Sequence, residues 1–572
     1  MKKIYLIALC ALTSYFSFAQ SLPHYMTAKE KALMEKMNKS PESTPASSDV
    51  NITPPQKKVR TIAEWEKLQG LQITWTSYPT MLTEIVRAAK EECRVYIVCN
   101  DPATVQSYLE SHGVDTVNVS FVKTKFNSVW CRDYGPWSAY TNDVDSLYTI
   151  DWKYNRPRPS DDTVPYTLGR LLHTPVYTTT TTPWKLVNTG GNFMTDGFGT
   201  GFASKLILNE NSSLSSAEVD TIMKKFMGIT TYIKMNTLPY DEIHHIDMHM
   251  KLLDEETLLV GQYPAGVADG PQIEANLNYI LANFKSVFGT PFKVIRIPMP
   301  DDRGKYPSNG GRYFTYTNAS FINKTLIYPT YGIPADTTAY RIFKEALPGY
   351  KIIGINSLSS IGALGALHCI TKEIGEEHPL LISHQALPNT TNTTKPYTLK
   401  AYLKHSSGIR SARIYWRTDT LQAYKAVVMS KVSGSPVYWT GSIPAQAAGK
   451  TVYYYIQATA NDGKVQNRPL PAPAGYWHFA VTSSAAIQPF TIKAPAPNPA
   501  RGFVTLGIQS KNNIQVSIDI CTVNKTKLIE VFHGITDGDK MVKADISKLT
   551  PGMYLIVYRS DDYETTGSLI VE

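Results

Sequence analysis

Cys369 ends a small, apolar, glycine-rich stretch over residues 359–369, and three side chains upstream give this thiol a chemical purpose. These are His245 and the carboxylates of Asp133 and Asp247. A thiolate attacks electrophilic carbon, a histidine moves protons, and two carboxylates hold a planar cation. The set therefore suits attack on a group such as a guanidinium.

Each of these side chains also has a purely structural interpretation. A buried cysteine is commonly a packed core residue, and Cys369 becomes a nucleophile only where its surroundings favour the thiolate. His245 and Asp247 share a face if their segment is a strand, whereas a solvated turn leaves them unpaired. Asp133 precedes Tyr134-Gly135-Pro136, so it either accepts from turn amides or pairs with a guanidinium.

A loop with two arginines offers a second binding feature. Arg156 and Arg158 are separated by one proline, which limits the freedom of the backbone. Two guanidinium forks at this spacing can hold one carboxylate. The alternative is a surface loop in which both arginines pair with Asp161 or Asp162.

The elements that must position these residues alternate between helix and strand from residue 62 to about residue 380. Helices are expected over 81–92 and 104–112, and strands over 94–99 and 116–122. This alternation predicts an α/β catalytic domain.

Beyond a polar linker at 387–396 the pattern contains only strands. They are expected over 397–403, 411–416 and 451–457, with Asn461-Asp462-Gly463 as a hairpin turn. The pattern predicts an immunoglobulin-like β-sandwich of about 100 residues, over 384–484. A proline-rich break at 494–502 marks the beginning of a further all-β unit, which we place over 490–572.

The N-terminal residues have the features of an export signal. Residues 1–20 combine two lysines, an apolar run too short for a good membrane span, and a small-residue cleavage site. Residues 21–57 are rich in Ser, Pro, Lys and Glu without strong periodicity, which indicates a propeptide or linker. No other long apolar stretch follows, so no transmembrane segment is expected.

Charge and cysteine content exclude some classes of protein. The net charge of +9 over 572 residues is not gathered into basic runs, which argues against nucleic-acid binding. Five cysteines follow the signal, an odd number that predicts at least one free thiol. A Cys93–Cys99 disulfide is conceivable, but the buried strand over 94–99 favours core cysteines.

Five segments occur in this order along the chain: Ala63–Glu66, Trp130–Trp137, Gly190–Asn192 with Gly197–Thr200, His245–Asp247, and Tyr316–Asn318 with Gly365–Cys369. Together they resemble the guanidino-modifying penteins, and among them the bacterial, Porphyromonas-type peptidylarginine deiminases, which are relatives of agmatine deiminase. The resemblance spans about residues 60–375. It implies a five-bladed α/β propeller as the catalytic domain, over residues 58–383.

The resemblance also implies a role for each matching residue. Cys369 resembles the nucleophile, His245 the acid/base, and Asn318 an asparagine near the thiol. Asp133 and Asp247 resemble the guanidinium-binding carboxylates. The other substrate contacts that we expect are Trp130, which could cover the stem of an arginine, Ile243, and the pair Arg156 and Arg158, whose loop resembles the one that holds the free C-terminal carboxylate of a peptide. No cofactor and no catalytic metal are expected.

The tail has its own resemblance. Pro497–Ala500 and Pro551–Tyr554 are similar to the C-terminal sorting domain of type IX secretion, which implies the secretion machinery as a partner and a secreted or outer-membrane surface location. We therefore expect an exported deiminase that converts peptidyl-arginine, preferentially at a C-terminus, to citrulline and ammonia through a covalent thiouronium intermediate. The alternatives are a deiminase for agmatine or free arginine, and a non-catalytic surface binding protein on the same scaffold.

Overall fold

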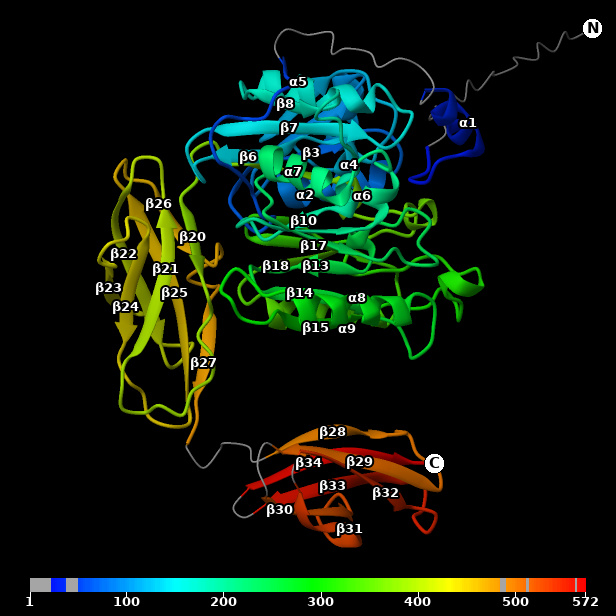
Figure 1. Cartoon of the computed structure of the whole chain (residues 1–572), viewed down its shortest axis with the longest axis vertical. Coiled ribbons are helices and arrows are strands. Elements are labelled where there is room, and N and C mark those ends of the chain that lie inside the picture. Colours follow the sequence, from blue (N-terminus) through cyan, green and yellow to red (C-terminus); the bar gives the residue numbers. More distant parts are fainter. Residues whose placement is uncertain (1–21, 38–49, 484–489, 511–513, 537, 561–562) are drawn as a thin grey trace, which may run out of the picture.

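The chain forms three parts that follow one another in sequence (Figure 1). The computed structural model describes residues 22–37, 50–483, 490–510, 514–536, 538–560 and 563–572. The expected export signal over 1–20 lies outside the described residues. An α/β part and an all-β part lie side by side in Figure 1, and a second all-β part lies apart from both.

The α/β part contains five sheets, and the same unit of strands and helices is repeated in each of them. An antiparallel strand pair comes first, and a helical crossover then leads to a third strand, parallel to the second. Parallel strands need such crossovers, and their buried positions favour apolar residues on both faces. In chain order the first four units are β6 (Trp137–Thr141), β7 (Leu147–Tyr154), α5 (Val164–Leu171) and β8 (Val176–Thr179); β10 (Met194–Thr195), β11 (Thr200–Ser204), α6 (Leu206–Asn209), α7 (Ser216–Met227) and β12 (Thr231–Met235); β13 (Met250–Leu252), β14 (Thr257–Gln262), α8 (Gly270–Asn283) and β15 (Lys293–Pro298); and β16 (Ser320–Ile322), β17 (Thr325–Thr330), α9 (Ala335–Ala346) and β18 (Lys351–Asn356).

The fifth unit joins the two ends of the α/β part. Its first strand, β19 (Lys372–Gly375), comes last in this part of the chain, yet it pairs antiparallel with β3 (Leu68–Thr74). This pairing brings the residues just before β19, including Cys369, back to the beginning of the part. The other elements of this unit are α2 (Pro79–Ala89), β4 (Arg94–Cys99), α3 (Pro102–Ser111) and β5 (Val119–Lys123). Three short strands join the sheet of β6 to β8, and these are β1 (Val50–Asn51), β2 (Val59–Thr61) and β9 (Val187–Asn188).

The expected elements at the start of this part are confirmed, with small shifts at their ends. β4 covers the predicted range 94–99 in full. The first helix begins at Pro79 rather than residue 81, and the second begins at Pro102, where the Asp101 side chain accepts a hydrogen bond from the Ala103 N–H. Proline at the first helical position and Asp at the N-cap are preferred because the first N–H groups of a helix lack helical partners.

The first all-β part contains the three predicted strands in one antiparallel arrangement. Gly463 in the predicted hairpin turn adopts a left-handed φ of 96°. Arg468 joins this part to the α/β part, 3.4 Å from a carboxylate oxygen of Glu255. The strands are β20 (Leu381–His384), β21 (Tyr397–Lys404), β22 (Ile409–Arg417), β23 (Lys425–Lys431), β24 (Tyr438–Ile443), β25 (Lys450–Ala460), β26 (Val465–Arg468) and β27 (Trp477–Val481).

The second all-β part has two antiparallel sheets with their own hydrophobic core. Their orders are β28-β29-β32 and β31-β30-β33-β34. The strands are β28 (Phe490–Ala496), β29 (Phe503–Ser510), β30 (Ile514–Cys521), β31 (Lys527–Thr536), β32 (Asp539–Asp545), β33 (Gly552–Ser560) and β34 (Tyr563–Val571).

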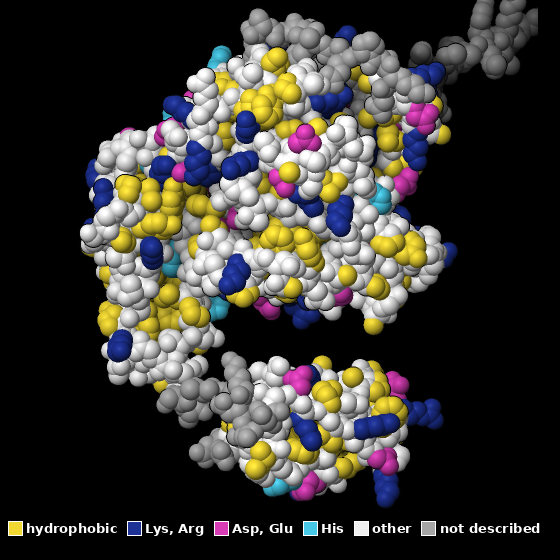
Figure 2. Space-filling view, in the orientation of Figure 1, with side chains coloured by type: hydrophobic (Ala, Val, Ile, Leu, Met, Phe, Trp, Pro, Cys, Tyr) yellow, Lys and Arg dark blue, Asp and Glu magenta, His cyan; other side chains and the backbone are white. Residues whose placement is uncertain are grey.

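The five cysteines of the described residues are all buried and free. Cys93 and Cys99 form no disulfide, and burial raises their thiol pKa values to about 12 and about 11. They are core residues, as the buried strand indicated. On the face drawn in Figure 2, Lys and Arg side chains are scattered and form no basic stripe. No described helix is both long enough and apolar enough to cross a membrane.

Candidate active site

The predicted site residues lie on short segments that immediately precede the first strands of the sheets. Asp133 lies on α4 (Cys131–Tyr134), just before β6, and Asp247 lies on the 3-10 turn η3 (Ile246–Met248), just before β13. Asn318 precedes β16, and Cys369 lies on the 3-10 turn η6 (His368–Ile370), just before β19. The same position in the repeated unit therefore supplies one side chain after another to a common site.

Cys369 is completely buried between Asn318 and Asp247. The Asn318 Nδ2 donates to Sγ at 3.2 Å, and the thiol donates to the Asp247 Oδ2 at 3.7 Å. Burial raises the pKa of the thiol well above its usual value, and the charges of Asp247 and Asp133 raise it further. Cys369 is a neutral thiol in this arrangement, and a cation beside it would favour the thiolate.

Asp133 and His245 form a second close pair in the site. The Asp133 Oδ1 accepts from the Gly191 N–H at 3.1 Å and lies 3.8 Å from the His245 Nδ1. Burial lowers the pKa of His245 to about 3, so its ring is neutral near pH 7. Burial opposes ionisation of Asp133, but the charge of His24 and its hydrogen bond lower the pKa of this carboxyl below its usual range.

The segment around His245 is neither a strand nor a solvated turn. His245 is the N-cap of η3, and its side chain and that of Asp247 are buried. Room for the imidazole comes from Gly191, where a Cβ would lie 2.3 Å from the His245 Nδ1. Ile243, expected as a substrate contact, is buried in the main hydrophobic core.

The arginine loop is buried, so the surface-loop interpretation of it is wrong. Only 7% of Arg156 and 1% of Arg158 is exposed. Neither Asp161 nor Asp162 takes up these guanidinium groups. Asp161 accepts from the backbone and side chain of Ser128, and Asp162 accepts from a neighbouring N–H group and a lysine.

A residue to which the sequence analysis gave no role occupies the centre of the site. His24 is fully buried, and its ring is stacked on that of Trp130 with a centroid distance of 4.4 Å and an interplanar angle of 9°. Its Nε2 is hydrogen-bonded to the Asp133 Oδ2. The Trp130 ring thus lies against the residue that is bonded to Asp133.

His24 belongs to a segment that we expected to be a propeptide or linker without a defined element. The segment contains a helix, α1 (Ala28–Met37). A signal for it was present in the sequence, because Thr27 and Glu30 have the spacing of a capping box. The Glu30 N–H donates to the Thr27 Oγ1 at 3.2 Å, and the Thr27 N–H donates to the Glu30 Oε2 at 2.9 Å.

His368, next to the thiol in sequence, is a second histidine that the analysis left without a role. Its Nδ1 is 2.7 Å from the Asp247 Oδ2, and its Nε2 is 2.7 Å from the Glu64 Oε1. A carboxylate only accepts hydrogen bonds, so two such partners require both ring nitrogens to carry protons. Burial opposes ionisation of Glu64, yet His368 and Lys251 hold its pKa well below the usual value.

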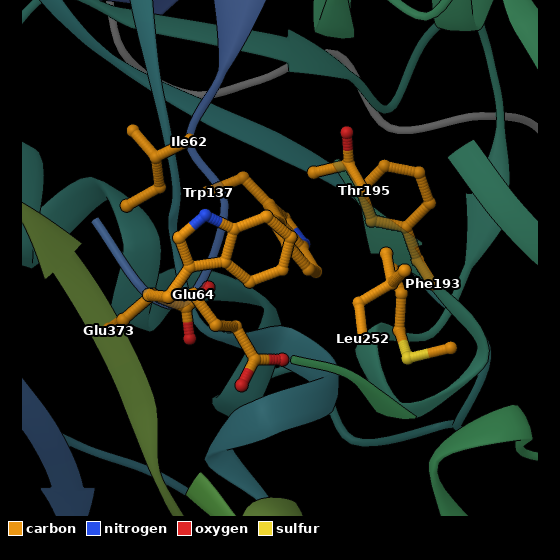
Figure 3. Close-up of a pocket in the computed structure, with 9 residues that line it drawn as sticks. Ile62, Glu64, Trp137, Phe193, Thr195, Leu252 and Glu373 are labelled. Atoms are coloured by element: carbon orange, nitrogen blue, oxygen red, sulfur yellow. The ribbon is translucent and has the colours of Figure 1, made fainter. Parts of the chain in front are cut away.

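Glu64 also lines a pocket in the interior of the α/β part (Figure 3). Trp137 forms part of its wall, and the Lys372 Nζ lies 3.0 Å from the centroid of the Trp137 ring. Trp137 is therefore a packing residue. The other lining residues are Ile62, Trp65, Phe193, Met194, Thr195, Leu252 and Glu373.

Among the described residues, His24, Asp133 and His245 form the one group whose side chains could together hold a metal ion. One ligand atom from each lies within 4.8 Å of the others, and imidazole and carboxylate are ligands that zinc accepts. In this arrangement a direct hydrogen bond already joins His24 to Asp133.

Comparison with known proteins supports both the catalytic part and the tail. Residues 60–374 match the family described as Porphyromonas-type peptidyl-arginine deiminase, and residues 496–572 match the secretion system C-terminal sorting domain. A sorting domain of this kind indicates export, either to the cell surface or into the medium.

Individual relatives agree with the family match. Two proteins named "Putative agmatine deiminase" are similar to this chain. The one from Legionella pneumophila is 24% identical, over 58% of this chain and 99% of its own length. The one from Vibrio parahaemolyticus is 23% identical, over 57% and 99%. The solved structure of agmatine deiminase from Enterococcus faecalis aligns with a TM-score of 0.51 at 18% identity, over 57% of this chain and all of that one (100%).

The family match covers more than half of the chain, including Cys369, His245 and both aspartates. At the identities above, the structural likeness shows the fold alone, and it agrees with the mixed α/β architecture. The chain therefore belongs to the Porphyromonas-type peptidyl-arginine deiminase family and is a guanidino-group deiminase.

Proposed function

We propose that the protein is an exported peptidylarginine deiminase that prefers a C-terminal arginine. The observation that carries this proposal is the contact between Arg156 and His24. The Arg156 Nε donates at 3.0 Å to the backbone carbonyl of the very residue whose side chain enters the site. In a peptide that ends in arginine, that carbonyl belongs to the terminal carboxylate, to which a guanidinium binds more strongly.

Two buried atoms mark where the substrate guanidinium would be held. The Asp247 Oδ1 and the His245 Nδ1 have no hydrogen-bond partner among the described residues. Leaving a buried polar atom unpaired costs about 1–3 kcal/mol, so such atoms indicate an absent ligand. A guanidinium has enough N–H groups to reach Asp133 and Asp247 together.

The chemistry proposed for this site is covalent catalysis. With the cation between the two carboxylates, the Cys369 sulfur forms a bond to the central guanidinium carbon. A carbon–nitrogen bond then breaks, and ammonia leaves with the proton of the thiol, which His245 transfers. Water, deprotonated by His245, displaces the sulfur from the remaining thiouronium. The products are citrulline, the free thiol and a proton, which the released ammonia takes up.

We further propose that the five sheets of the α/β part are the five blades of a propeller, with the site at its centre. The repeated unit and the closure of β19 onto β3 support this arrangement. We also propose an immunoglobulin-like form for the first all-β part and the type IX route for export. Their support is the antiparallel strand arrangement and the sorting-domain match.

The second candidate function is deimination of agmatine, which the names of the relatives favour. Agmatine carries a second amine where a C-terminal arginine carries a carboxylate. In the proposed binding mode this amine would lie near the buried Arg156 and Arg158, and the positive charges would repel each other. A purely binding role is the least favoured, because Cys369, His245 and both aspartates are all present in one site.

The test is to measure citrulline or its analogue from four substrates. These are a peptide ending in arginine, the same peptide as its C-terminal amide, a peptide with internal arginine, and agmatine. Because His24 and its neighbours occupy the site, the protein is assayed both intact and after cleavage within residues 38–49, which separates residues 22–37 from the rest of the chain. Cys369→Ala is the inactive control. We expect the peptide acid to have the highest kcat/KM. A higher value for agmatine would overturn the proposal.

A further inference from the structure

The segment before the α/β part covers the reacting side chains. The His24 N–H donates to the Ala363 carbonyl at 3.0 Å, and the Trp130 Nε1 donates to the Leu22 carbonyl at 2.9 Å. These bonds attach the segment to the glycine-rich loop on one side and to the tryptophan on the other. His24 fills the space between Trp130, Asp133 and His245.

The ring of His24 presents the features of a guanidinium to this site. Its Nδ1 is 2.8 Å from the Leu364 carbonyl, and its Nε2 is bonded to Asp133. Both partners accept only, so both ring nitrogens donate and the ring is a cation. A planar cation that lies flat on an indole face and donates to a carboxylate matches what the site should bind in a substrate.

The loop that accepts the ring is shaped for close contact. Leu364 adopts a left-handed φ of 64°, which a leucine rarely does. Its carbonyl is thereby available to the His24 Nδ1. At Gly365 a Cβ would lie 2.3 Å from the Trp130 ring, so the loop can approach the tryptophan only with glycine at this position.

The arginine loop holds the same segment. Arg156 donates to the His24 carbonyl at 3.0 Å, and Arg158 donates to the Pro23 carbonyl at 2.6 Å. Arg158 also donates through Nε to the Glu30 Oε1 at 2.8 Å. One segment thus supplies a cation to the carboxylate side of the site and a carboxylate to its arginine side.

Helix α1 is built around that carboxylate rather than around an apolar face. Its one buried residue is Glu30. Docking by apolar packing would bury leucine and methionine from this helix instead. The capping bonds with Thr27 hold the Glu30 side chain at the start of the helix, where a carboxylate is also favoured by the helix dipole.

We propose that residues 22–37 are a built-in pseudosubstrate that keeps the exported enzyme latent until the chain is cut between Met37 and Val50. Within the uncut chain the segment is always close to the site, at an effective concentration on the order of millimolar. After cleavage the segment is a separate peptide that dilution removes. An imidazole has no amino group that can leave as ammonia, so His24 binds without reacting.

This proposal relies on the proposed function for the identity of the substrate, but not for the latency itself. Two measurements therefore run in parallel. One is kcat/KM for the peptide acid. The other is the rate at which iodoacetamide alkylates Cys369, followed by mass spectrometry, with the buried Cys93, Cys99, Cys131 and Cys521 as internal controls.

The decisive experiment uses the full chain with a site-specific protease sequence placed within residues 38–49. We expect cleavage and dilution to raise both the alkylation rate of Cys369 and kcat/KM at least tenfold. The synthetic peptide 22–37 should restore inhibition, and it should compete with substrate. If cleavage changes neither quantity, the latency is disproved. If alkylation rises and no arginine compound is deiminated, the latency stands and the proposed function fails.

Point variants of the uncut chain test the individual contacts. His24→Ala and Glu30→Gln should each raise the Cys369 alkylation rate several-fold. Glu35→Gln is the matched control, because Glu35 lies on the same helix with its side chain exposed, and this variant should stay latent. Equal effects from Glu30→Gln and Glu35→Gln would overturn the anchoring role of Glu30.

A chelator distinguishes charge mimicry from metal binding, since His24, Asp133 and His245 lie close enough to share an ion. EDTA should leave the uncut chain latent. If EDTA alone activates it, a metal holds the segment and the pseudosubstrate proposal is wrong.

Discussion

His24 and His368 are both imidazoles held between two acceptors in the candidate site, but they come from different parts of the chain. His368 lies between Asp247 and Glu64, which both belong to the α/β part. His24 lies between Asp133 and the Leu364 carbonyl, and it comes from the N-terminal segment. The two carboxylates predicted to bind the guanidinium thus have different partners.

This difference separates a permanent partner from an exchangeable one. His368 is fixed by the turn that carries Cys369, so Asp247 keeps one oxygen bonded to it and has the other without a partner among the described residues. The partner of Asp133 can leave with its segment, and a substrate cation can then take its place. We infer that Asp133 is the entry point for the guanidinium and that Asp247 is an oriented acceptor already in position.

Exchange of each aspartate for asparagine should give the largest losses of activity and should also distinguish the role of Asp133 from that of Asp247. Each of Asp133→Asn and Asp247→Asn should lower kcat/KM of the cleaved enzyme at least 100-fold, about 2.7 kcal/mol, because a desolvated cation loses one anion. Loss of either negative charge favours the Cys369 thiolate, but only Asp133 holds His24. In the uncut chain Asp133→Asn should therefore speed alkylation of Cys369 more than Asp247→Asn does. Equal alkylation in both variants would contradict the division of roles.

Glu64→Gln tests the contact between Glu64 and His368, the permanent partner of Asp247. The amide oxygen can still accept from His368, but the loss of charge weakens the chain of contacts that orients Asp247. We expect kcat to fall about tenfold with KM nearly unchanged, because misplacement of a reacting group affects the chemical step. Glu66→Gln is the matched control. Glu66 pairs with Arg60, so its loss should lower Tm without lowering kcat.

The arginine loop allows the two anchors to be separated. Arg156 contacts the carbonyl of the residue whose side chain enters the site, whereas Arg158 contacts the preceding carbonyl and Glu30. Arg156→Ala should therefore remove most of the preference for a peptide acid over its amide, a change of several-fold. Arg158→Ala should weaken both substrates and release the latent segment. A preference that survives Arg156→Ala would contradict this assignment.

Of these changes, a moderate fall in pH should have the smallest effect on the binding of residues 22–37. The folded-state pKa of Asp133 is lowered, so the stability that its ionised form contributes is present above the unfolded value of about 3.9 and is lost as pH falls through the folded value. Between pH 6 and pH 4 the segment should stay bound. Hydrogen exchange of residues 22–37, relative to the free peptide, should change less than twofold. Loss of protection above pH 4 would mean that another group controls release.

Much of the candidate site was predictable because its residues lie in short, ordered motifs. Cys369, Asn318, Asp133 and Asp247 all lie together as expected, and Trp130 faces the same space. The repeated unit explains this result, since each motif immediately precedes the first strand of a sheet. The alternation of helix and strand likewise predicted the α/β class.

The partners of those residues were not predictable from local pattern. Glu64 and His368 are 304 residues apart, and His24 and Asp133 are 109 residues apart. No periodicity or spacing connects them. For the same reason, the sequence could not distinguish between a surface loop and a buried clamp for Arg156 and Arg158, because both use the same residues.

By itself, then, the sequence determined the chemistry that is available: one thiol, one histidine, two carboxylates and two arginines on matching motifs. Only the tertiary structure decided which partner each of these groups has. The physical reason is that the state of a buried group depends on the charges packed against it, and chain segments distant in sequence supply those charges. Closure of β19 onto β3 sets His368 beside Glu64, and docking of residues 22–37 sets His24 on Asp133.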